Sequence, residues 1–404
     1  MGVWGWCAFC RYVRWNWLKP TSYHVSYNVP LLEHKQQVGA FEKTGESPLR
    51  VLFAVSAWGL GHATRDLVLI RALLSAGHQV SILSTGRALR LLRGELGAAC
   101  NYINLPDIPI PLSRKALAFY VKMTLSLPMV FWTFQREHQF VHRLCRTQRF
   151  DRIVSDSRYG VFMKRIPSFY VVHSLRQIVP GRPKLIELMI ERIQYRMFAG
   201  ARKLIIPDQE ENGLAGDLCH DVTFFPRDRL EYIGVLSSVR RREVQPDVDY
   251  FISVSGAEPQ RSIFEEMVLA QARGLKGRVV IALGKPDIPL TVEDDGRLAV
   301  YSFMDRRQQE EMMNRARLVV SRSGYTTLME LAELGKRALL VPTVGQSEQE
   351  YLGEYHERLG TMHAVNQNHL SLVRDVDVAE GYRRIPLSHG TEESAARFLE
   401  VIAA

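Results

Sequence analysis

Residues 320–351 read VSRSGYTTLMELAELGKRALLVPTVGQSEQEY, and this stretch indicates the fold. A short apolar run ends at a Ser-Gly turn, a segment with helical spacing follows, and a second apolar run ends at Pro342. A strand, a helix and a strand in this order are typical of a βαβ unit with parallel strands.

The same alternation is found along most of the chain from residue 49 onward. Apolar runs predict strands at residues 49–56, 79–84, 152–156, 169–174, 249–255, 278–283, 298–303, 318–321 and 338–342. The charged stretch VRRREVQPD at 239–247 divides these runs into two series. We therefore predict an α/β protein with two doubly wound Rossmann-like domains that face a cleft.

These patterns predict the following segments. Residues 1–48 form an N-terminal extension, residues 49–238 an acceptor-side domain, and residues 239–248 a linker. Residues 249–386 form a donor domain, and residues 387–404 form a C-terminal helix that packs back on the acceptor-side domain. The extension is rich in tryptophan, and its basic residues argue against a secretory signal. Three interpretations remain open for it: a poorly ordered tail, sequence upstream of the natural start, or an aromatic membrane anchor.

Composition excludes several classes of protein. With 46% hydrophobic and 24% charged residues, the chain is neither disordered nor a coiled-coil rod. Its formal charge of +9 favours an anionic partner, either nucleic acid, a phosphate-bearing substrate or an acidic membrane face. Five cysteines in 404 residues do not form a disulfide framework, which favours a cytoplasmic location.

The stretch FAVSAWGLGHATRD at 53–66 contains the first candidate site. Gly59 and Gly61 lie between a predicted strand and a predicted helix, where a ligand can approach the backbone. Thr64 stands where a dinucleotide-binding loop would have its third glycine, which argues against NAD. His62 is a candidate general base, and a histidine that packs or caps the helix is the alternative.

The stretch at 320–351 contains the second candidate site. Ser323, Gly324, Thr326 and Thr327 open a helix, whose free amides suit a diphosphate. Glu330 follows on the expected ligand side, where its carboxylate is suited to ribose hydroxyls. The amides and carboxylates of residues 346–350 suit a sugar, and the alternative is a capped helix with a solvated acidic face.

These motifs resemble those of nucleotide-sugar glycosyltransferases with the GT-B fold. The likeness is greatest to the group of the peptidoglycan lipid-intermediate N-acetylglucosaminyltransferase and related UDP-glycosyltransferases. The family pattern R-S-G-x-x-T-x-x-E, then G-x-x-A-L-x-V-P and an acidic/Gln pair, matches residues 322–330, 335–342 and 349–350. The glycine loop G-x-G-H-x-x-R at 59–65 is similar as well. The resemblance covers about residues 49–404.

The resemblance implies a role for each matching residue. His62 would be the catalytic base, and the donor would be held by Ser255, Gly256, Phe303, Met304, Arg322, Ser323, Gly324, Thr326, Thr327, Glu330, Gln349 and Glu350. Among these, Glu330 would hold the ribose, and the backbone at Phe303 and Met304 would hold the nucleobase. The resemblance implies no cofactor besides the nucleotide-sugar co-substrate, and no metal.

Two further strand ends complete the predicted site. Asp156 ends the strand in FDRIVSDSRYG, and in related enzymes a carboxylate at this loop orients the catalytic histidine. A surface loop aspartate is the alternative. His173 ends the strand in FYVVHS and is predicted, with Gly59 and Gly61, to lie on the acceptor side. Asp247-Val248-Asp249 spells a metal-binding motif, but it lies in the linker and looks incidental.

Residues 114–152 combine basic and apolar side chains. Eight lysines or arginines and two acidic residues accompany a segment, 116–134, that is apolar but interrupted by Lys122 and Pro128. We predict either an interfacial or acceptor-lining helix whose basic flanks suit anionic lipid, or a core helix of the first domain with a basic outer face. Nucleic-acid binding is not expected, because the aromatic residues cluster with aliphatic ones.

The sequence thus predicts an inverting, metal-independent glycosyltransferase. It would move a sugar from a nucleotide-sugar donor, expected to be UDP-linked, to a hydroxyl acceptor that is lipid-linked or part of the cell envelope. A nucleotide-sugar hydrolase or 2-epimerase of the same fold is the alternative, and a non-enzymatic nucleotide-sugar-binding protein is a third possibility. The expected location is the cytoplasm, with peripheral attachment to the inner face of the membrane.

Overall fold

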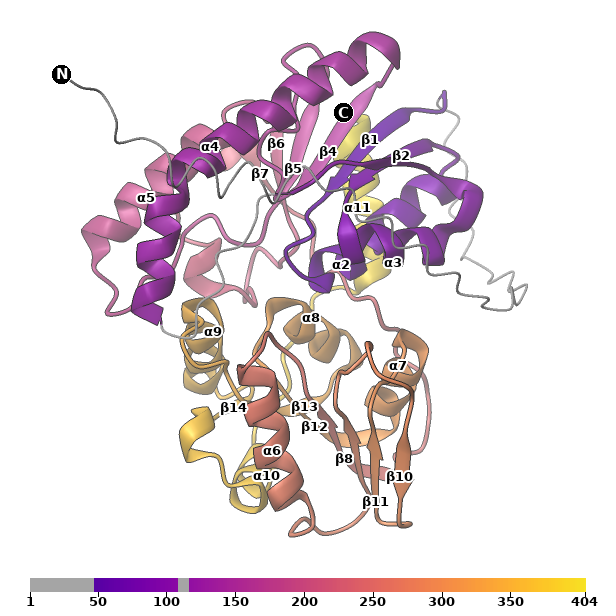
Figure 1. Cartoon of the computed structure of the whole chain (residues 1–404), viewed down its shortest axis with the longest axis vertical. Coiled ribbons are helices and arrows are strands. Elements are labelled where there is room, and N and C mark those ends of the chain that lie inside the picture. Colours follow the sequence, from indigo (N-terminus) through magenta and orange to yellow (C-terminus); the bar gives the residue numbers. More distant parts are fainter. Residues whose placement is uncertain (1–46, 108–115) are drawn as a thin grey trace, which may run out of the picture. The chain divides into compact units, whose positions relative to one another are not determined.

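The computed structural model describes residues 47–107 and 116–404, without the side chains of 116–125 and 127. The predicted extension 1–48 therefore lies almost entirely outside the described residues, as do Arg114, Lys115 and the side chain of Lys122. The described residues belong to one compact unit, Phe41–Ala404. Within it the chain forms two α/β sheets in succession, shown from indigo to pink and from orange to yellow in Figure 1.

The first sheet is wholly parallel and has the strand order β3-β2-β1-β4-β5-β6-β7. Its strands are β1 Arg50–Val55, β2 Gln79–Ser84, β3 Asn101–Asn104, β4 Arg152–Asp156, β5 Ser168–Val171, β6 Lys203–Ile206 and β7 Leu230–Tyr232. Its helices are α2 Leu60–Ser75, α3 Gly86–Leu96, α4 Ala116–Thr147 and α5 Lys184–Met197. Residues 51–55 of β1 are fully buried, as expected for a central strand covered on both faces.

The second sheet repeats this plan with the order β10-β11-β9-β8-β12-β13-β14. Its strands are β8 Val248–Ser253, β9 Val279–Ala282, β10 Val292–Asp294, β11 Leu298–Tyr301, β12 Ala316–Ser321, β13 Arg337–Leu340 and β14 His363–Ala364. Its helices are α6 Gln260–Ala272, α7 Arg306–Arg315, α8 Tyr325–Leu334, α9 Ser347–Leu359 and α10 Leu372–Glu380. Only the β10–β11 pair is antiparallel among the described strands. The predicted fold class, two doubly wound domains, is confirmed.

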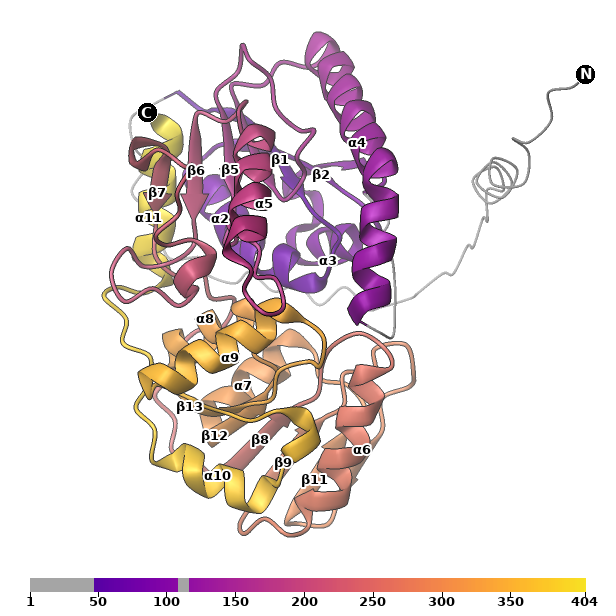
Figure 2. The same cartoon turned by 90° about the vertical axis from the view of Figure 1, so that its left-hand side faces the viewer.

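The chain connects the two sheets twice. It leaves the first sheet after β7 and enters the second at β8, so that residue 248 of the predicted linker belongs to a strand. It returns after α10, and the last helix, α11 Thr391–Ala403, packs against α2 of the first domain, as Figures 1 and 2 show. Arg152 on β4 donates from Nε to the carbonyl of Ile402 at 2.7 Å. The C-terminal helix thus fastens the second domain's end to the first.

Each sheet has one place where its strand order reverses, between β1 and β4 in the first and between β8 and β12 in the second. At such a point the loops that leave the two neighbouring strands run to opposite sides, and ligands bind outside the carboxyl ends of these strands. The four loops concerned follow residues 55, 156, 253 and 321. The last two loops contain Ser255 and Ser323, Asp156 is the last residue of β4, and His62 follows the first loop in the first turn of α2.

Candidate active site

The loop after β1 is shaped by a glycine and anchored by an aspartate. Gly59 has φ of 130°, a conformation that residues with a side chain rarely adopt, and α2 starts at the next residue. Asp107 holds the start of the loop by accepting hydrogen bonds from Ser56 Oγ at 2.9 Å and from the amide of Ala57 at 2.8 Å. His62 consequently stands in the first turn of α2.

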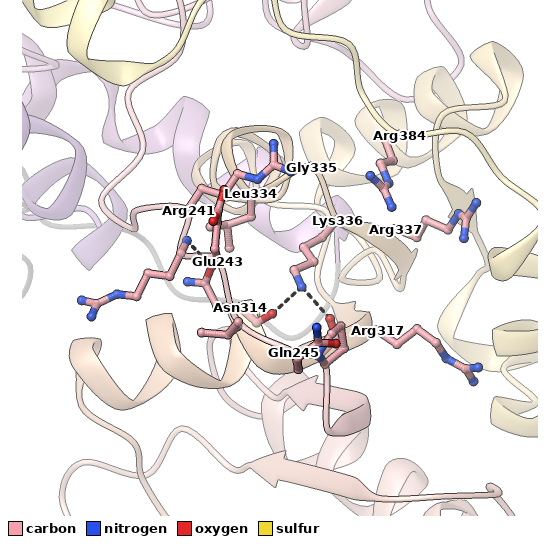
Figure 3. A pocket seen from close by; sticks show the side chains of 14 residues that line it. Arg241, Glu243, Gln245, Asn314, Arg317, Leu334, Gly335, Lys336, Arg337 and Arg384 are labelled. Atoms are coloured by element: carbon pink, nitrogen blue, oxygen red, sulfur yellow. Dashed lines mark hydrogen bonds between the residues drawn. The ribbon is translucent and has the colours of Figure 1, made fainter.

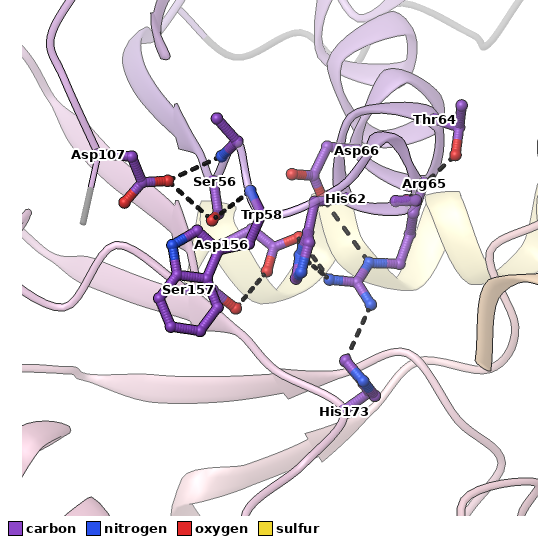
Figure 4. Close-up of polar contacts among 12 residues, drawn as sticks. Ser56, Trp58, His62, Thr64, Arg65, Asp66, Asp107, Asp156, Ser157 and His173 are labelled. Atoms are coloured by element: carbon purple, nitrogen blue, oxygen red, sulfur yellow. Dashed lines mark hydrogen bonds and ion pairs between the residues drawn. The ribbon is translucent and has the colours of Figure 1, made fainter. Parts of the chain in front are cut away.

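His62 and Asp156 are in direct contact (Figure 4). The Nδ1 atom of His62 lies 2.9 Å from Oδ2 of Asp156, and the Asp156 side chain is fully buried. Nη2 of Arg65 also lies 3.2 Å from Nδ1 of His62, but the shorter contact is with the carboxylate. Since a carboxylate only accepts hydrogen bonds, this contact favours the tautomer with the proton on Nδ1, which leaves Nε2 of His62 to accept a proton. The structure thus brings together the two residues predicted as base and orienting acid, and Asp156 is no surface loop residue.

Arg65, one turn after His62, completes this arrangement. Its guanidinium is almost fully buried and donates through Nη2 to Oδ2 of Asp156. Burial alone would raise the pKa of Asp156, but the charge of Arg65, followed by that of His62, outweighs it and holds this pKa well below its usual range. Asp156 is therefore ionised at neutral pH and can stabilise a protonated His62.

Asp66 is a second buried carboxyl beside this group. Its Oδ1 atom lies 3.9 Å from Nε of Arg65, and neither atom has a hydrogen-bond partner among the described residues. Burial, and then the charge of Asp156, raises the pKa of Asp66 well above its usual value. The single buried cation of Arg65 thus balances one carboxylate, that of Asp156, and Asp66 favours its neutral form.

His173 extends the group toward the second domain. Arg65 donates through Nη1 to Nδ1 of His173 at 3.2 Å, so that the ring proton of His173 is on Nε2, which faces Oε1 of Glu348 at 3.4 Å. The ring of His173 also stacks on that of Tyr325, with centroids 4.8 Å apart. His173, which was predicted to contact the acceptor, has these protein contacts and keeps a side chain that is 16% exposed.

The donor loop lies between β12 and α8. Ser323 is buried and donates from Oγ to the carbonyl of Gln349 at 2.7 Å, and Gly324 caps α8. A Cβ atom on Gly61 would lie 2.8 Å from Oγ1 of Thr326. The first turn of α8, where Thr326 and Thr327 stand, is therefore next to the turn of α2 that carries His62.

Arg322 is placed differently from the predicted donor contact. It is buried, its guanidinium lies over the ring of Phe264 with 4.2 Å to the centroid, and Nη2 donates to the carbonyl of Gln260 at 2.8 Å. Nη1 donates to the carbonyls of Val341 and Pro342. These bonds give Arg322 the task of holding the loops that surround the donor segment.

Glu330 is half-buried on α8, two turns from the donor loop. It accepts a hydrogen bond from Oγ of Ser238 at 2.6 Å. Burial raises its pKa, while the Ser238 hydroxyl and the nearby Arg306 oppose that shift. Arg306 itself is held by the carbonyl of Ser238, and its Nη1 has no partner among the described residues. A carboxylate and an unpaired guanidinium nitrogen are thus within reach of one ligand.

The other predicted donor residues surround the same loop. Met304 is buried and Phe303 half-buried after β11, whereas Ser255 and Gly256 are exposed after β8. Gln349 accepts through Oε1 from the amide of Thr343 at 2.9 Å, and Glu350 accepts from the amide of Gly345 at 2.9 Å. These two side chains therefore shape the loop after β13, and their predicted contacts with sugar hydroxyls remain predictions.

Three polar residues of this region have no role predicted from the sequence: Arg65, Asp66 and Thr343. Arg65 belongs to the G-x-G-H-x-x-R pattern, which by itself indicates no partner for it. Arg65 and Asp66 are a charged pair among the apolar residues of a helix that covers the sheet, and this pattern could have indicated buried charges. Thr343 has a buried hydroxyl without a partner among the described residues, 3.8 Å from where a Cβ on Gly256 would lie. Thr343 directly follows Pro342, for which the sequence predicts only the end of a strand.

Within the described residues, one group has the chemistry of metal ligands: Asp208, Cys219 and His220. Oδ1 of Asp208 accepts hydrogen bonds from the amides of Gln209 and Leu214, and burial raises the pKa of the Cys219 thiol well above its usual value. This group thus works as a hydrogen-bonded loop anchor. The predicted absence of a metal from the reaction remains a prediction.

Comparisons with known proteins bear on the fold and on the enzyme class. Residues 258–379 match the Glycosyltransferase family 28 C-terminal domain. An uncharacterized glycosyltransferase of Methanosarcina acetivorans is 23% identical over 367 residues, which is 83% of this chain and 92% of that protein.

Two solved structures are similar in fold. MurG of Acinetobacter baumannii has a TM-score of 0.57 at 15% identity and covers 88% of this chain and 99% of its own. The spinosyn rhamnosyltransferase SpnG complexed with thymidine diphosphate has a TM-score of 0.52 at 15% identity, over 88% and 95%. The predicted likeness to glycosyltransferases of the GT-B fold, and the predicted enzyme class, are confirmed.

The buried charges predict a difference between two aspartates. Asp156→Asn leaves the Arg65 cation buried without its counter-charge and is expected to lower the free energy of unfolding by about 3–5 kcal/mol. Asp66→Asn is expected to have much less effect at neutral pH, because an amide resembles the protonated acid.

Urea unfolding of both variants at pH 7 checks this expectation. Since the folded state keeps the proton of Asp66 longer than the unfolded chain does, Asp66 weakens the wild-type fold as pH rises above about 4. Asp66→Asn should remove that part of the pH dependence. Equal losses of stability in the two variants would contradict the assignment of the charge to Asp156.

Proposed function

We propose that this glycosyltransferase of the GT-B fold moves a sugar from a nucleotide-sugar donor, UDP-linked in our assignment, to a hydroxyl group with inversion at the anomeric carbon. The observation that carries the proposal is the position of the His62–Asp156 pair beside the first turn of α8. A base and a binding site for a leaving diphosphate are then adjacent, as transfer requires.

The proposed mechanism uses the free nitrogen of His62. Nε2 takes the proton of the acceptor hydroxyl while the hydroxyl oxygen bonds to the anomeric carbon. The bond from that carbon to the diphosphate oxygen breaks, and the nucleoside diphosphate leaves. Asp156, fixed by Arg65, stabilises the protonated ring of His62.

The proposed donor site lies along α8. The free amides at the start of this helix and its dipole favour the negative charge that develops on the departing diphosphate. Glu330 would accept hydrogen bonds from the ribose in place of its bond to Ser238. With the leaving group stabilised in this way by the helix and its hydroxyls, we propose that transfer needs no metal ion.

The proposed acceptor is a hydroxyl compound attached to lipid or to the cell envelope, reached from the inner face of the membrane. Phe131 and Trp132 on α4 are 64% and 56% exposed, which excludes these two from the core. Leu185, Met189 and Ile193 form an exposed stripe at four-residue spacing on α5. Both helices cover the face of the first sheet opposite α2 and α11 (Figure 2).

Basic residues accompany this apolar surface. Arg136 lies over the ring of Trp132 with 4.6 Å to the centroid, and Lys184, Arg192 and Arg196 are exposed on α5. Apolar side chains with basic neighbours are typical of helices that bind anionic membrane surfaces. No helix within 47–107 and 116–404 is long and apolar enough to cross a membrane.

The base is tested by His62→Ala. This variant should bind the donor normally and lose about 10²–10⁴-fold in transfer, because general-base catalysis contributes that much. His369→Ala, at an exposed position in the second domain, is the matched control. Near-normal transfer by His62→Ala would reduce His62 to a structural role. If the wild type hydrolyses or isomerises the donor as fast without any acceptor as with one, the result would instead favour a hydrolase or 2-epimerase.

The donor site is tested by Glu330→Ala. Loss of charge-assisted hydrogen bonds to the ribose should weaken UDP binding by about 1.5–3 kcal/mol in a calorimetric titration. Glu354→Ala on the exposed side of α9 removes the same charge without reaching α8 and should bind UDP as the wild type does. UDP affinity that Glu330→Ala leaves unchanged would refute the ribose contact.

Membrane attachment is tested by Phe131→Ser with Trp132→Ser. Since both rings are exposed, the double variant should melt as the wild type does but sediment less with anionic vesicles, above all at high salt. Ile288→Ser with Leu290→Ser changes two exposed apolar residues of the second domain and should leave sedimentation unchanged. A wild-type protein that ignores anionic vesicles at low salt would end the membrane proposal.

A further inference from the structure

A basic pocket lies in the second domain at the amino ends of β12 and β13 (Figure 3). It has a volume of 480 Å³ and is lined by residues 241–246 of the connection between the sheets, the end of α8, the starts of the two strands, and Arg384. Pockets of this size accommodate small ligands.

Cations dominate the pocket wall. Six of its fourteen lining residues are positively charged and one, Glu243, is acidic. The cations are Arg241, Arg242, Arg317, Lys336, Arg337 and Arg384.

Three of these cations have structural partners. Arg242 pairs with Glu310 at 2.6 Å and Arg317 with Glu380 at 2.8 Å. Lys336 donates from Nζ to the carbonyls of Asn314 and Ala316 and so satisfies the end of α7. Their positive charges are explained by the fold alone.

The other three cations have no such explanation. Among the described residues, Arg241, Arg337 and Arg384 make no ion pair with a carboxylate, and Arg337 uses only Nε, toward the carbonyl of Tyr382. All three line the pocket together with Lys336, whose pKa is lowered to about 8 by its burial and then by the charges of Arg384 and Arg241. A cluster of mutually repelling cations becomes more stable when an anion binds among them.

We propose that this pocket binds a multiply charged phosphate compound, held by Arg241, Arg337 and Arg384. Guanidinium groups suit this ligand because each can give two parallel hydrogen bonds to phosphate oxygens. The chemistry is shared by a free polyphosphate and by a phosphorylated lipid headgroup, and the experiment below distinguishes these two sources.

The pocket is separate from the donor site. The pocket lies at Ala316, the first residue of β12, whereas the donor loop follows Ser321 at the other end of that strand. At about 3.3 Å per residue, roughly 16 Å of strand lie between them. The inference therefore does not depend on which nucleotide-sugar the enzyme uses.

The pocket lies on both connections between the two domains. Arg241 comes from the connection that leads from the first sheet to the second, and Arg384 from the segment that returns to α11 on the first domain. An anion held by both would tie the two connections together at one point. Its binding would restrain movement of one domain against the other.

The test measures binding of inorganic tripolyphosphate by calorimetry, in the presence of excess UDP so that the donor site is occupied. The wild type should bind one tripolyphosphate, and Arg241→Gln with Arg384→Gln should weaken this binding about tenfold or more, because charge-assisted hydrogen bonds are lost. Both arginines are exposed, and melting curves confirm that the double variant is folded.

The matched control is Arg273→Gln with Lys276→Gln, which removes two exposed charges of the same domain away from the pocket and should leave affinity unchanged. Vesicles that contain phosphatidic acid, whose phosphate monoester can carry two charges, form the second arm. Vesicle binding that the pocket variant loses, without tripolyphosphate binding, assigns the site to a lipid headgroup. The proposal is overturned if the wild type binds neither probe, if the pocket variant binds both probes as the wild type does, or if the control variant loses affinity as much as the pocket variant.

Discussion

The buried ion pair between Arg65 and Asp156 is the interaction on which the site depends. It connects α2 to the end of β4, at the point where the strand order of the first sheet reverses. The same carboxylate oxygen receives Nδ1 of His62, so one buried charge fixes both the position of the helix turn and the tautomer of the histidine. Without Asp156 the buried cation of Arg65 would strongly destabilise the folded state. The two side chains therefore stay paired.

The second domain supplies the complementary half. Its own reversal point, between β8 and β12, puts the start of α8 at the carboxyl edge of the sheet. Contacts from both domains meet there: Gly61 approaches Thr326, and His173 stacks on Tyr325 and faces Glu348. Side chains of both domains are thereby next to one another, and α11 returns to pack against α2.

Much of the fold and several site residues could be predicted from the sequence, because the strands of a parallel sheet are visible as local apolar runs. Each long apolar run marks a buried strand, and the residue after it lies at the edge where ligands bind. His62, Asp156 and Ser323 were found in this way. Five strands, β3, β6, β7, β10 and β14, were not predicted, because each has only two to four residues and gives no clear pattern.

Side-chain partners could not be predicted in the same way. Arg322 matches the family's donor motif, yet its guanidinium bonds to three backbone carbonyls that only the folded loops bring together. Asp66 and Arg65 are adjacent in sequence, and nothing local shows which aspartate the arginine neutralises. For the helix at 116–147, the sequence left a core and an interfacial position open, and only the structure shows that Phe131 and Trp132 are exposed.

The central claim is that the start of α8 holds the diphosphate of a nucleotide-sugar. It is tested most directly by thermal unfolding in the presence of a panel of nucleoside diphosphates and their sugar conjugates. A ligand present at a hundred times its dissociation constant should stabilise the fold by about 2.7 kcal/mol, and we expect this for at least one nucleotide, with UDP the first candidate. A panel in which no nucleoside diphosphate and no nucleotide-sugar shifts the transition would contradict the claim.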